Sequence, residues 1–327
     1  MSRPTTALTL FAVYVAAALL AAGGAELYLR RNDGADRCLS APRPEDLGRP
    51  HAEYARIDPD LGWVSAPVGN EVNADGFRDP RAFDAATAAA ARRRIVVLGD
   101  SFMWGAGIAA DDSVPRRLER ALGDDTAVFN VSVPGWGLDQ MYLAWRRYRD
   151  VLRPDVVVVA FIDDDVDRVL MTYRQRERLE KPAFRIDGGR LVPRGADPPP
   201  GVVRAALRSS VVARCLRLAF DRATAARPLG RHLLRTLADD AAAHGARVVV
   251  LRIPERDVVA SAFRRRWWTL RGFADAAPGA TYVEPLRELE TLQQTGPTPY
   301  VADGHLSADG STVVADRLAA AVRRAWR

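Results

Sequence analysis

The sequence is poor in lysine, cysteine and histidine. Among 47 basic residues Lys181 is the only lysine, so the net charge of +6 comes almost wholly from arginines spread along 327 residues. Evenly spread arginines are typical of solvated helix faces, and the chain has no basic tail, so nucleic-acid binding is not predicted. The two cysteines, Cys38 and Cys215, are too few for a disulfide framework and lack metal-site spacing. One disulfide bond and two free thiols stay open as alternatives, and we predict no metal ion and no cofactor.

Long hydrophobic runs are also scarce, because only one is long enough to cross a bilayer. From Thr5 to Leu29 apolar and small residues follow one another with no charge before Glu26. Arg30 and Arg31 come next, as is typical of a membrane–water interface. We predict that residues 1–31 form an uncleaved signal anchor, with a signal peptide cut near residues 23–25 as the alternative. The chain is then single-pass, with its remainder on one side of the membrane.

After residue 93 the sequence alternates short apolar runs with segments of helical periodicity. The apolar runs, which predict buried strands, are residues 94–99, 127–131, 155–161 and 247–251, with a weaker run at 282–283. The segments with apolar residues at helical spacing are 114–122, 138–145, 229–246 and 314–326. This order predicts an α/β fold with a parallel sheet covered by helices on both faces.

Three regions are expected around this pattern. Residues 1–31 form the anchor, and residues 32–93 form a linker followed by a short strand and turn segment packed on the body. Residues 94–327 form the α/β domain. Within it, residues 171–226 break the alternation with a predicted hairpin at 184–192, a proline run and a helix, so we interpret them as an insertion.

A serine, a histidine and an aspartate stand where an α/β sheet collects reactive groups. Ser101 follows the first strand, and His305 precedes the last helix, with Asp303 two residues before it. A serine hydroxyl needs an adjacent base, normally a histidine held by a carboxylate, before it can act as a nucleophile. Taken alone, Asp303 in an Asp-Gly-His loop would be interpreted as a turn-forming residue.

Four sequence blocks in this order resemble the SGNH/GDSL hydrolases. They are Gly99-Asp100-Ser101, Asn130 with Gly135 five residues later, the Asp-rich turn after residues 155–161, and Asp303-Gly304-His305. The resemblance covers roughly residues 94–327 apart from the insertion. The anchor helix and residues 60–63, 73–78 and 133–140 resemble the membrane-tethered bacterial branch of that family. The resemblance implies a flavodoxin-like three-layer α/β/α sandwich that hydrolyses or transfers an acyl group.

The resemblance also implies roles for individual residues. Ser101 would be the nucleophile, His305 the general base and then acid, and Asp303 the carboxylate that orients the histidine. The oxyanion hole would hold the Ser101 and Gly135 N–H groups and a side chain from the third block. That side chain is normally asparagine, whereas this sequence has Asp164.

An ionised Asp164 cannot donate a hydrogen bond, and it would repel a forming oxyanion. Three interpretations stay open: Asp164 is protonated because its neighbours and burial raise its pKa, the hole works with two backbone donors, or the site is inactive. A cation held by residues 163–165 is a fourth interpretation, which we disfavour because consecutive side chains diverge.

Trp104 and Trp136 stand close to the site blocks, and we expect them to form an apolar or sugar-stacking wall, with core packing as the alternative.

The sequence therefore predicts a membrane-anchored serine esterase whose catalytic domain is periplasmic or extracellular. Its expected substrate is an acyl ester, in the first place an O-acetyl ester of a cell-envelope glycan, or a small ester. A polysaccharide O-acetyltransferase with the same triad is one alternative. A disarmed fold that acts as a glycan-binding or assembly factor is another.

Overall fold

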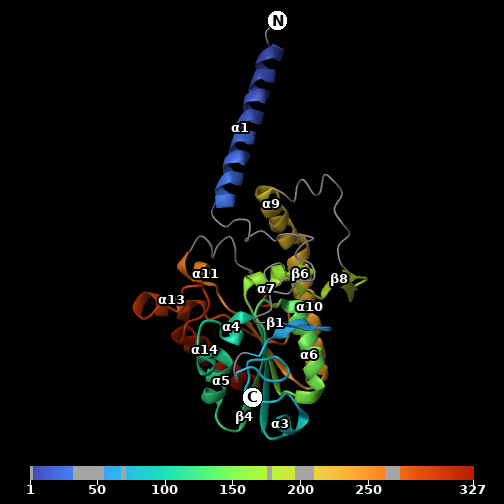
Figure 1. The fold of residues 1–327 in the computed structure, drawn as a ribbon, viewed down its shortest axis with the longest axis vertical. Coiled ribbons are helices and arrows are strands. Elements are labelled where there is room, and N and C mark those ends of the chain that lie inside the picture. The colour runs from blue at the N-terminus through green and yellow to red at the C-terminus, as the bar shows by residue number, and fades with distance from the viewer. Residues whose placement is uncertain (1–2, 32–54, 68–70, 175–178, 196–209, 262–272) are drawn as a thin grey trace.

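A parallel sheet forms the centre of the protein, as the computed structural model shows for residues 3–31, 55–67, 71–174, 179–195, 210–261 and 273–327 (Figure 1). Its five strands are β3 (Arg93–Gly99), β4 (Thr126–Ser132), β5 (Val156–Phe161), β10 (Arg247–Arg252) and β11 (Thr281–Val283). The spatial order β4-β3-β5-β10-β11, counted by position in the chain, is 2-1-3-4-5, which is the flavodoxin-like order. All four pairings are parallel, so the predicted fold class is confirmed.

The strands are apolar on both faces because helices cover both. In β3, Val96 and Leu98 join one buried cluster, whereas Ile95 and Val97 join the other. Helices α6 (Leu138–Leu152) and α10 (Arg227–Ala243) cover the first face, and α5 (Val114–Leu122) and α14 (Ala308–Ala325) cover the second. The result is the three-layer sandwich that the family resemblance implied, with helices on both faces of the sheet as the order of apolar runs predicted. Further helices are α3 (Ala85–Ala89), α4 (Ser101–Trp104), η2 (Ala110–Asp112), α7 (Asp163–Arg168), α11 (Arg256–Ala260) and α13 (Leu286–Thr295).

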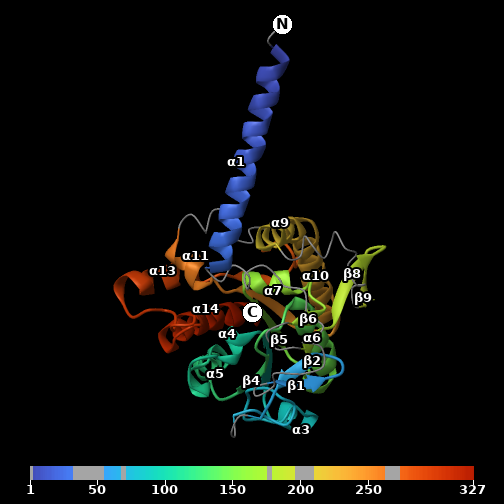
Figure 2. The same cartoon turned by 45° about the horizontal axis from the view of Figure 1, so that its top comes forward.

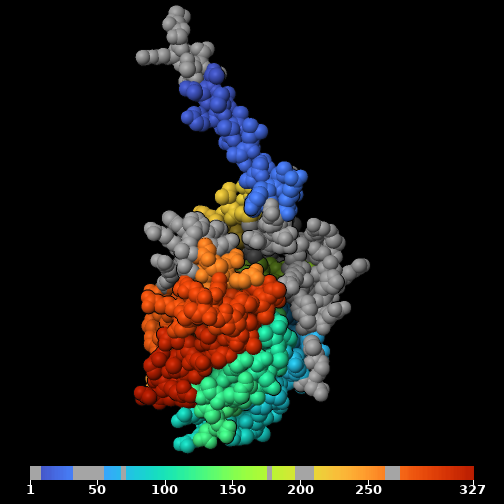
Figure 3. Space-filling view, turned by 90° about the vertical axis from the view of Figure 1, so that its left-hand side faces the viewer, coloured from blue at the N-terminus to red at the C-terminus, as the bar shows by residue number. Residues whose placement is uncertain are grey.

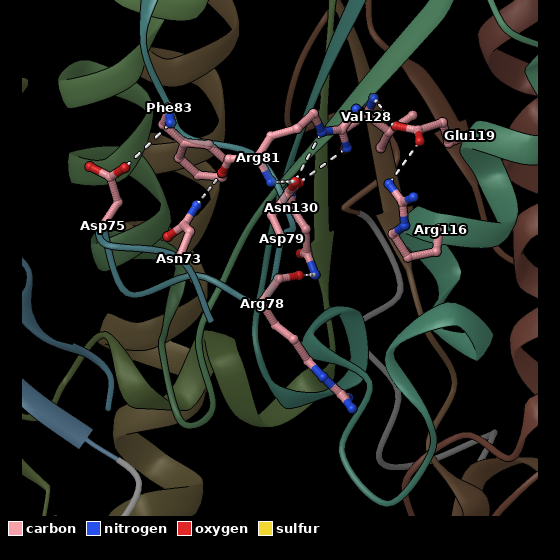
Figure 4. A network of polar contacts seen from close by, with 10 residues as sticks. All are labelled: Asn73, Asp75, Arg78, Asp79, Arg81, Phe83, Arg116, Glu119, Val128 and Asn130. Carbon is pink, nitrogen blue, oxygen red and sulfur yellow. Dashed lines mark hydrogen bonds and ion pairs between the residues drawn. The ribbon is translucent and has the colours of Figure 1, made fainter. Parts of the chain in front are cut away.

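The segment before the sheet protects its β4 edge. It contains the antiparallel hairpin of β1 (Ala55–Asp58) and β2 (Gly62–Ser65), and then a loop that crosses β4. Figure 4 shows the loop's contacts: Asp79 accepts the Asn130 N–H at 2.9 Å, and the Asn130 amide donates to the Arg78 carbonyl at 3.2 Å. Glu119 accepts the Val128 N–H at 2.8 Å. Side chains thus occupy backbone groups that an edge strand would otherwise leave unpaired.

The insertion contains two small antiparallel ladders and a long helix. The predicted hairpin is confirmed as β8 (Ala183–Asp187) paired with β9 (Arg190–Arg194), and β6 (Tyr173–Arg174) pairs with β7 (Leu179–Glu180). Helix α9 (Val211–Asp221) runs through a π-helical turn, η3 (Arg222–Ala226), directly into α10. The helix of the insertion is therefore continuous with a helix of the sheet layer.

Cys215, in α9, is disulfide-bonded, so of the two alternatives for the cysteines the disulfide bond is found. The sequence holds one other cysteine, Cys38. That residue and the predicted linker at 32–50 lie outside the described residues.

Most of helix α1 (Arg3–Arg31) projects away from the body, as the space-filling view shows (Figure 3). Its segment Thr9–Arg31 is long and apolar enough to cross a membrane, with a mean hydropathy of 1.9. A signal sequence at this position would have the same length and composition.

The one lysine forms a fully buried ion pair. The Lys181 ammonium contacts the Asp139 carboxylate, and both side chains are inaccessible to solvent. Burial lowers the pKa of Lys181 and raises the pKa of Asp139, and each partner's charge opposes the shift of the other. Because Asp139 lies in the first turn of α6 and Lys181 in the insertion, the pair fastens the insertion to the body.

We predict that Lys181→Met lowers the free energy of unfolding by about 3–5 kcal/mol, because it leaves a buried carboxylate without its partner. The double variant Lys181→Met/Asp139→Leu should recover most of the loss, because it removes both charges. Urea denaturation of the full chain in detergent measures both. A double variant as unstable as the single one would contradict this account.

Candidate active site

Ser101 lies at the carboxyl end of β3, where the chain turns sharply into α4. A side chain at Gly99 would come within 2.5 Å of Met103, so the turn requires glycine there. Asp100 caps α4 by accepting the Phe102 N–H at 2.9 Å. The serine side chain is thereby fixed at the edge of the sheet with about 9% of its surface exposed.

His305 reaches Ser101 from the loop before α14. Its Nε2 lies 2.8 Å from Ser101 Oγ, which is hydrogen-bond distance. The Phe102 ring packs against the imidazole with ring centroids 5.0 Å apart. The loop is closed by Val301, whose N–H donates to the His305 carbonyl at 2.8 Å. Serine and histidine, 204 positions apart in the chain, are thus in direct contact.

Asp303 contacts His305 twice. Its Oδ1 accepts the His305 backbone N–H at 3.1 Å and lies 3.0 Å from the ring Nδ1. The Nδ1 atom does not reach the alignment of a well-formed hydrogen bond, so this contact is mainly electrostatic. Burial would raise the pKa of Asp303, but the contacts with His305 outweigh it and lower the pKa. Asp303 therefore shapes the turn and faces the imidazole at the same time.

Two backbone N–H groups are free at the same edge. Gly135 lies in the turn after β4 with a φ of +83°, a conformation that favours glycine. Within the described part of the chain, neither the Ser101 N–H nor the Gly135 N–H donates a hydrogen bond. Both groups follow the carboxyl ends of neighbouring strands, β3 and β4.

The three carboxylates of the Asp-rich turn point in different directions. Asp163 is paired with Arg252, with oxygen to nitrogen distances of 2.7 and 2.9 Å, and Asp165 contacts Arg168. Asp164 is exposed and makes no hydrogen bond or ion pair with a described residue. Among the described residues no group of His, Cys, Asp or Glu could hold a metal ion, so the cation interpretation gains no support.

Arg168 joins the three loops of the site, although no motif in the sequence pointed to it. One of its terminal nitrogens lies 3.2 Å from Asp100 Oδ2 and 3.0 Å from the Trp136 carbonyl, and it also contacts Asp165. Ser101 Oγ lies 3.3 Å from the same Asp100 oxygen. The i,i+3 spacing from Asp165 to Arg168 on a helix predicts their contact, but the other two partners come from distant segments.

Glu255 is a second residue that the sequence did not point to. It follows β10, the neighbour of β5, and is half-buried. Burial raises its pKa to about 8, with repulsion from Asp164 and Asp163 adding to the shift. Burial and the neighbouring acidic turn thus both favour the protonated form of Glu255.

Trp104 and Trp136 both hydrogen-bond through their indole N–H groups to residues of the β1–β2 hairpin. Trp136 is fully buried, and its indole N–H donates to the Trp63 carbonyl at 2.9 Å. The expected substrate-facing wall is therefore wrong for Trp136, because the β1–β2 hairpin covers it. Trp104 is half-buried, donates to Ser65 Oγ at 3.0 Å and stacks against Arg78, 4.4 Å from its ring centroid. A role for Trp104 in substrate binding stays a prediction.

No protein-family model and no curated protein matches the sequence. Solved structures do match. TesA is 15% identical with a TM-score of 0.43, over 71% of this chain and 99% of its own. A putative lipolytic protein of the G-D-S-L family from Desulfitobacterium hafniense is 11% identical with a TM-score of 0.43, over 70% and 98%. Esterase EstA from Pseudoalteromonas is 10% identical with a TM-score of 0.43, over 71% and 97%. Similarities of this size do not define a function for this chain.

The shifted pKa of Glu255 predicts a dependence of stability on pH. Folding raises this pKa from 4.5 to about 8, so the folded protein holds the proton more tightly than the unfolded chain. The resulting stability is complete at low pH and is lost as the pH rises through about 8. Glu255→Gln should flatten this part of the profile in urea denaturation between about pH 5 and pH 9.

Glu180→Gln, at an exposed position, is the matched control for the loss of one carboxylate. An unchanged profile in Glu255→Gln would contradict the assignment.

Proposed function

We propose that this protein is a membrane-anchored serine esterase that acts on an acyl ester. The observation that carries the proposal is the 2.8 Å contact between Ser101 Oγ and His305 Nε2, with Asp303 on the far side of the ring. A serine in hydrogen-bond contact with a histidine that a carboxylate faces is the arrangement that activates a hydroxyl for attack on a carbonyl carbon.

In the proposed reaction Ser101 Oγ attacks the ester carbonyl and His305 takes the hydroxyl proton. His305 then protonates the departing alcohol, and water releases the acyl group from the serine by the reverse sequence of proton transfers. The N–H groups of Ser101 and Gly135 would bind the oxyanion, because both are free and lie at the same edge. The buried Arg168 cation keeps their loops together and offsets the negative charge of Asp100 and Asp165.

The proposed substrate is an acyl ester of a cell-envelope glycan, with an O-acetyl group as the first candidate, or a small ester.

The proposed location places the body on the periplasmic or outer side of the membrane, anchored by α1. The disulfide bond of Cys215 supports this location, because disulfides persist in oxidising compartments. A polysaccharide O-acetyltransferase would use the same triad with a sugar hydroxyl in place of water, and adding a glycan acceptor to the assay distinguishes the two.

Ser101→Ala tests the nucleophile. We expect it to lower hydrolysis of a small activated acetyl ester by about 10³-fold or more, because no other group then attacks the carbonyl. Ser113→Ala is the matched control, since Ser113 is also buried but makes no capping hydrogen bond at the start of α5. Equal activity of the two variants would exclude Ser101 as the nucleophile.

Asp164 favours a second candidate function, a glycan-binding fold without turnover. We expect Asp164→Asn to raise kcat on the same ester, by up to about 10²-fold, because an amide donates to the oxyanion where a carboxylate repels it. A wild-type protein that is inactive while Asp164→Asn is active would favour the binding function. A fall in kcat would show instead that the carboxylate assists the reaction.

A further inference from the structure

The end of α1 is joined to the body at α9. The Glu26 carboxylate accepts the backbone N–H groups of Val211 and Val212 and the Ser210 hydroxyl, each at 2.9 Å. These contacts occupy the donors that the first turn of a helix leaves free. The disulfide bond of Cys215 lies one turn further along α9. The anchor helix therefore has a defined attachment to the body.

The outer face of α9 is apolar and uncovered. Leu216 is 68% exposed and Phe220 is 64% exposed, and their i,i+4 spacing places them on one face. Elsewhere on the described part of the body, only Ile57 among the large apolar residues reaches similar exposure, at 63%. Figure 2 shows α9 lying crosswise to α1, on the side of the body from which α1 leaves.

The depth of α9 follows from its attachment to Glu26. About 20 apolar residues span the hydrocarbon core of a bilayer, and in α1 such a stretch ends at Glu26. Glu26 and the basic residues after it then lie at the membrane–water interface, and the start of α9 lies at the same level. A helix at that level with an apolar outer face and crosswise orientation has the geometry of an interfacial helix.

We propose that the outer face of α9, carrying Leu216 and Phe220, rests in the headgroup layer of the bilayer that α1 spans. The proposal rests on the anchoring part of the proposed function. The proposal also indicates where the substrate ester is located. In Figure 2, α7 and α11, at the carboxyl edge of the sheet, lie on the same side of the body as α9. The reacting edge thus faces the membrane, and the ester it meets is carried at the membrane surface.

A partly buried ion pair links this surface helix to the site. Arg222, in the π-helical turn after α9, donates from Nε to both carboxylate oxygens of Asp167 at 2.8 Å. Asp167 belongs to α7, the helix that carries Asp164. The contact of α9 with lipid therefore sets the orientation of the edge that contains Ser101, and the body cannot turn independently of its anchor.

Spin labelling of the full chain in vesicles of phosphatidylcholine and phosphatidylglycerol tests the proposal. A nitroxide is attached to Phe220→Cys without reductant, so that the native disulfide bond stays intact. Ile57→Cys is the matched control because its native side chain is equally exposed. Val15→Cys, in the middle of the apolar segment of α1, tests whether that segment lies in the bilayer. Relative to position 57, the label at position 220 should collide with oxygen more often and with a soluble nickel chelate about threefold less often.

Equal nickel accessibility at positions 220 and 57, with position 15 protected, would overturn the proposal while leaving the anchor intact. An unprotected position 15 would overturn the anchor, and the proposal with it. Neither readout needs turnover, so a protein without esterase activity would refute only the catalytic proposal.

A second measurement concerns the substrate. Leu216→Ser/Phe220→Ser should slow cleavage of an ester embedded in the vesicles roughly fivefold and leave cleavage of a water-soluble ester unchanged. The reason is that α9 then no longer keeps the carboxyl edge of the sheet against the membrane surface. Ile57→Ser is the control, and an equal loss on both esters would contradict the proposal.

Discussion

The buried cation of Arg168 is the interaction on which the arrangement of the site depends. Its guanidinium contacts one group from each of the loops that follow β3, β4 and β5. Burial raises the pKa of Asp165, the Asp100 charge adds to that shift, and Arg168 opposes it. Without the cation, two carboxylates would face each other in a nearly water-free space, so the three loops could not keep this spacing.

Arginines make most of the ion pairs that hold the loops of the site, because the chain has only one lysine. A guanidinium is planar and offers several donors, so one side chain can serve acceptors from different segments. Arg252 binds both oxygens of Asp163, and Arg222 does the same for Asp167. The turn after β5 is therefore held by three arginines from three parts of the chain, and of its first three carboxylates only that of Asp164 stays free among the described residues.

The fold could be predicted from the sequence to the extent that its signals are local. A strand buried on both faces is a continuous apolar run, and a helix packed on a sheet has apolar residues every three or four positions, so residues 94–99 and 114–122 are recognisable alone. The continuity of α9 with α10 was not recognised, because a π-helical turn has no sequence signature of its own.

In the site, too, local features could be predicted from the sequence and features that depend on distant segments could not. Ser101, Asp303 and His305 could be brought together because each stands next to an element boundary that is visible in the sequence. The burial of Trp136 depends on a hairpin more than 70 positions earlier, and its indole hydrogen bond crosses that interval. Apart from the contact of Arg168 with Asp165, Arg168 and Glu255 owe their surroundings to segments that meet only in the folded sheet, and no spacing in the sequence encodes such a meeting.

The covering of β4 has a consequence for the protein's behaviour at high concentration. Where copies of a chain are crowded together, exposed strand edges pair between neighbours. Here one outer strand has its backbone groups occupied by Asp79, Glu119 and Arg81, and the opposite outer strand, β11, is only three residues long. Both edges thus resist the addition of a foreign strand, so neighbouring copies can meet without joining through their sheets into aggregates.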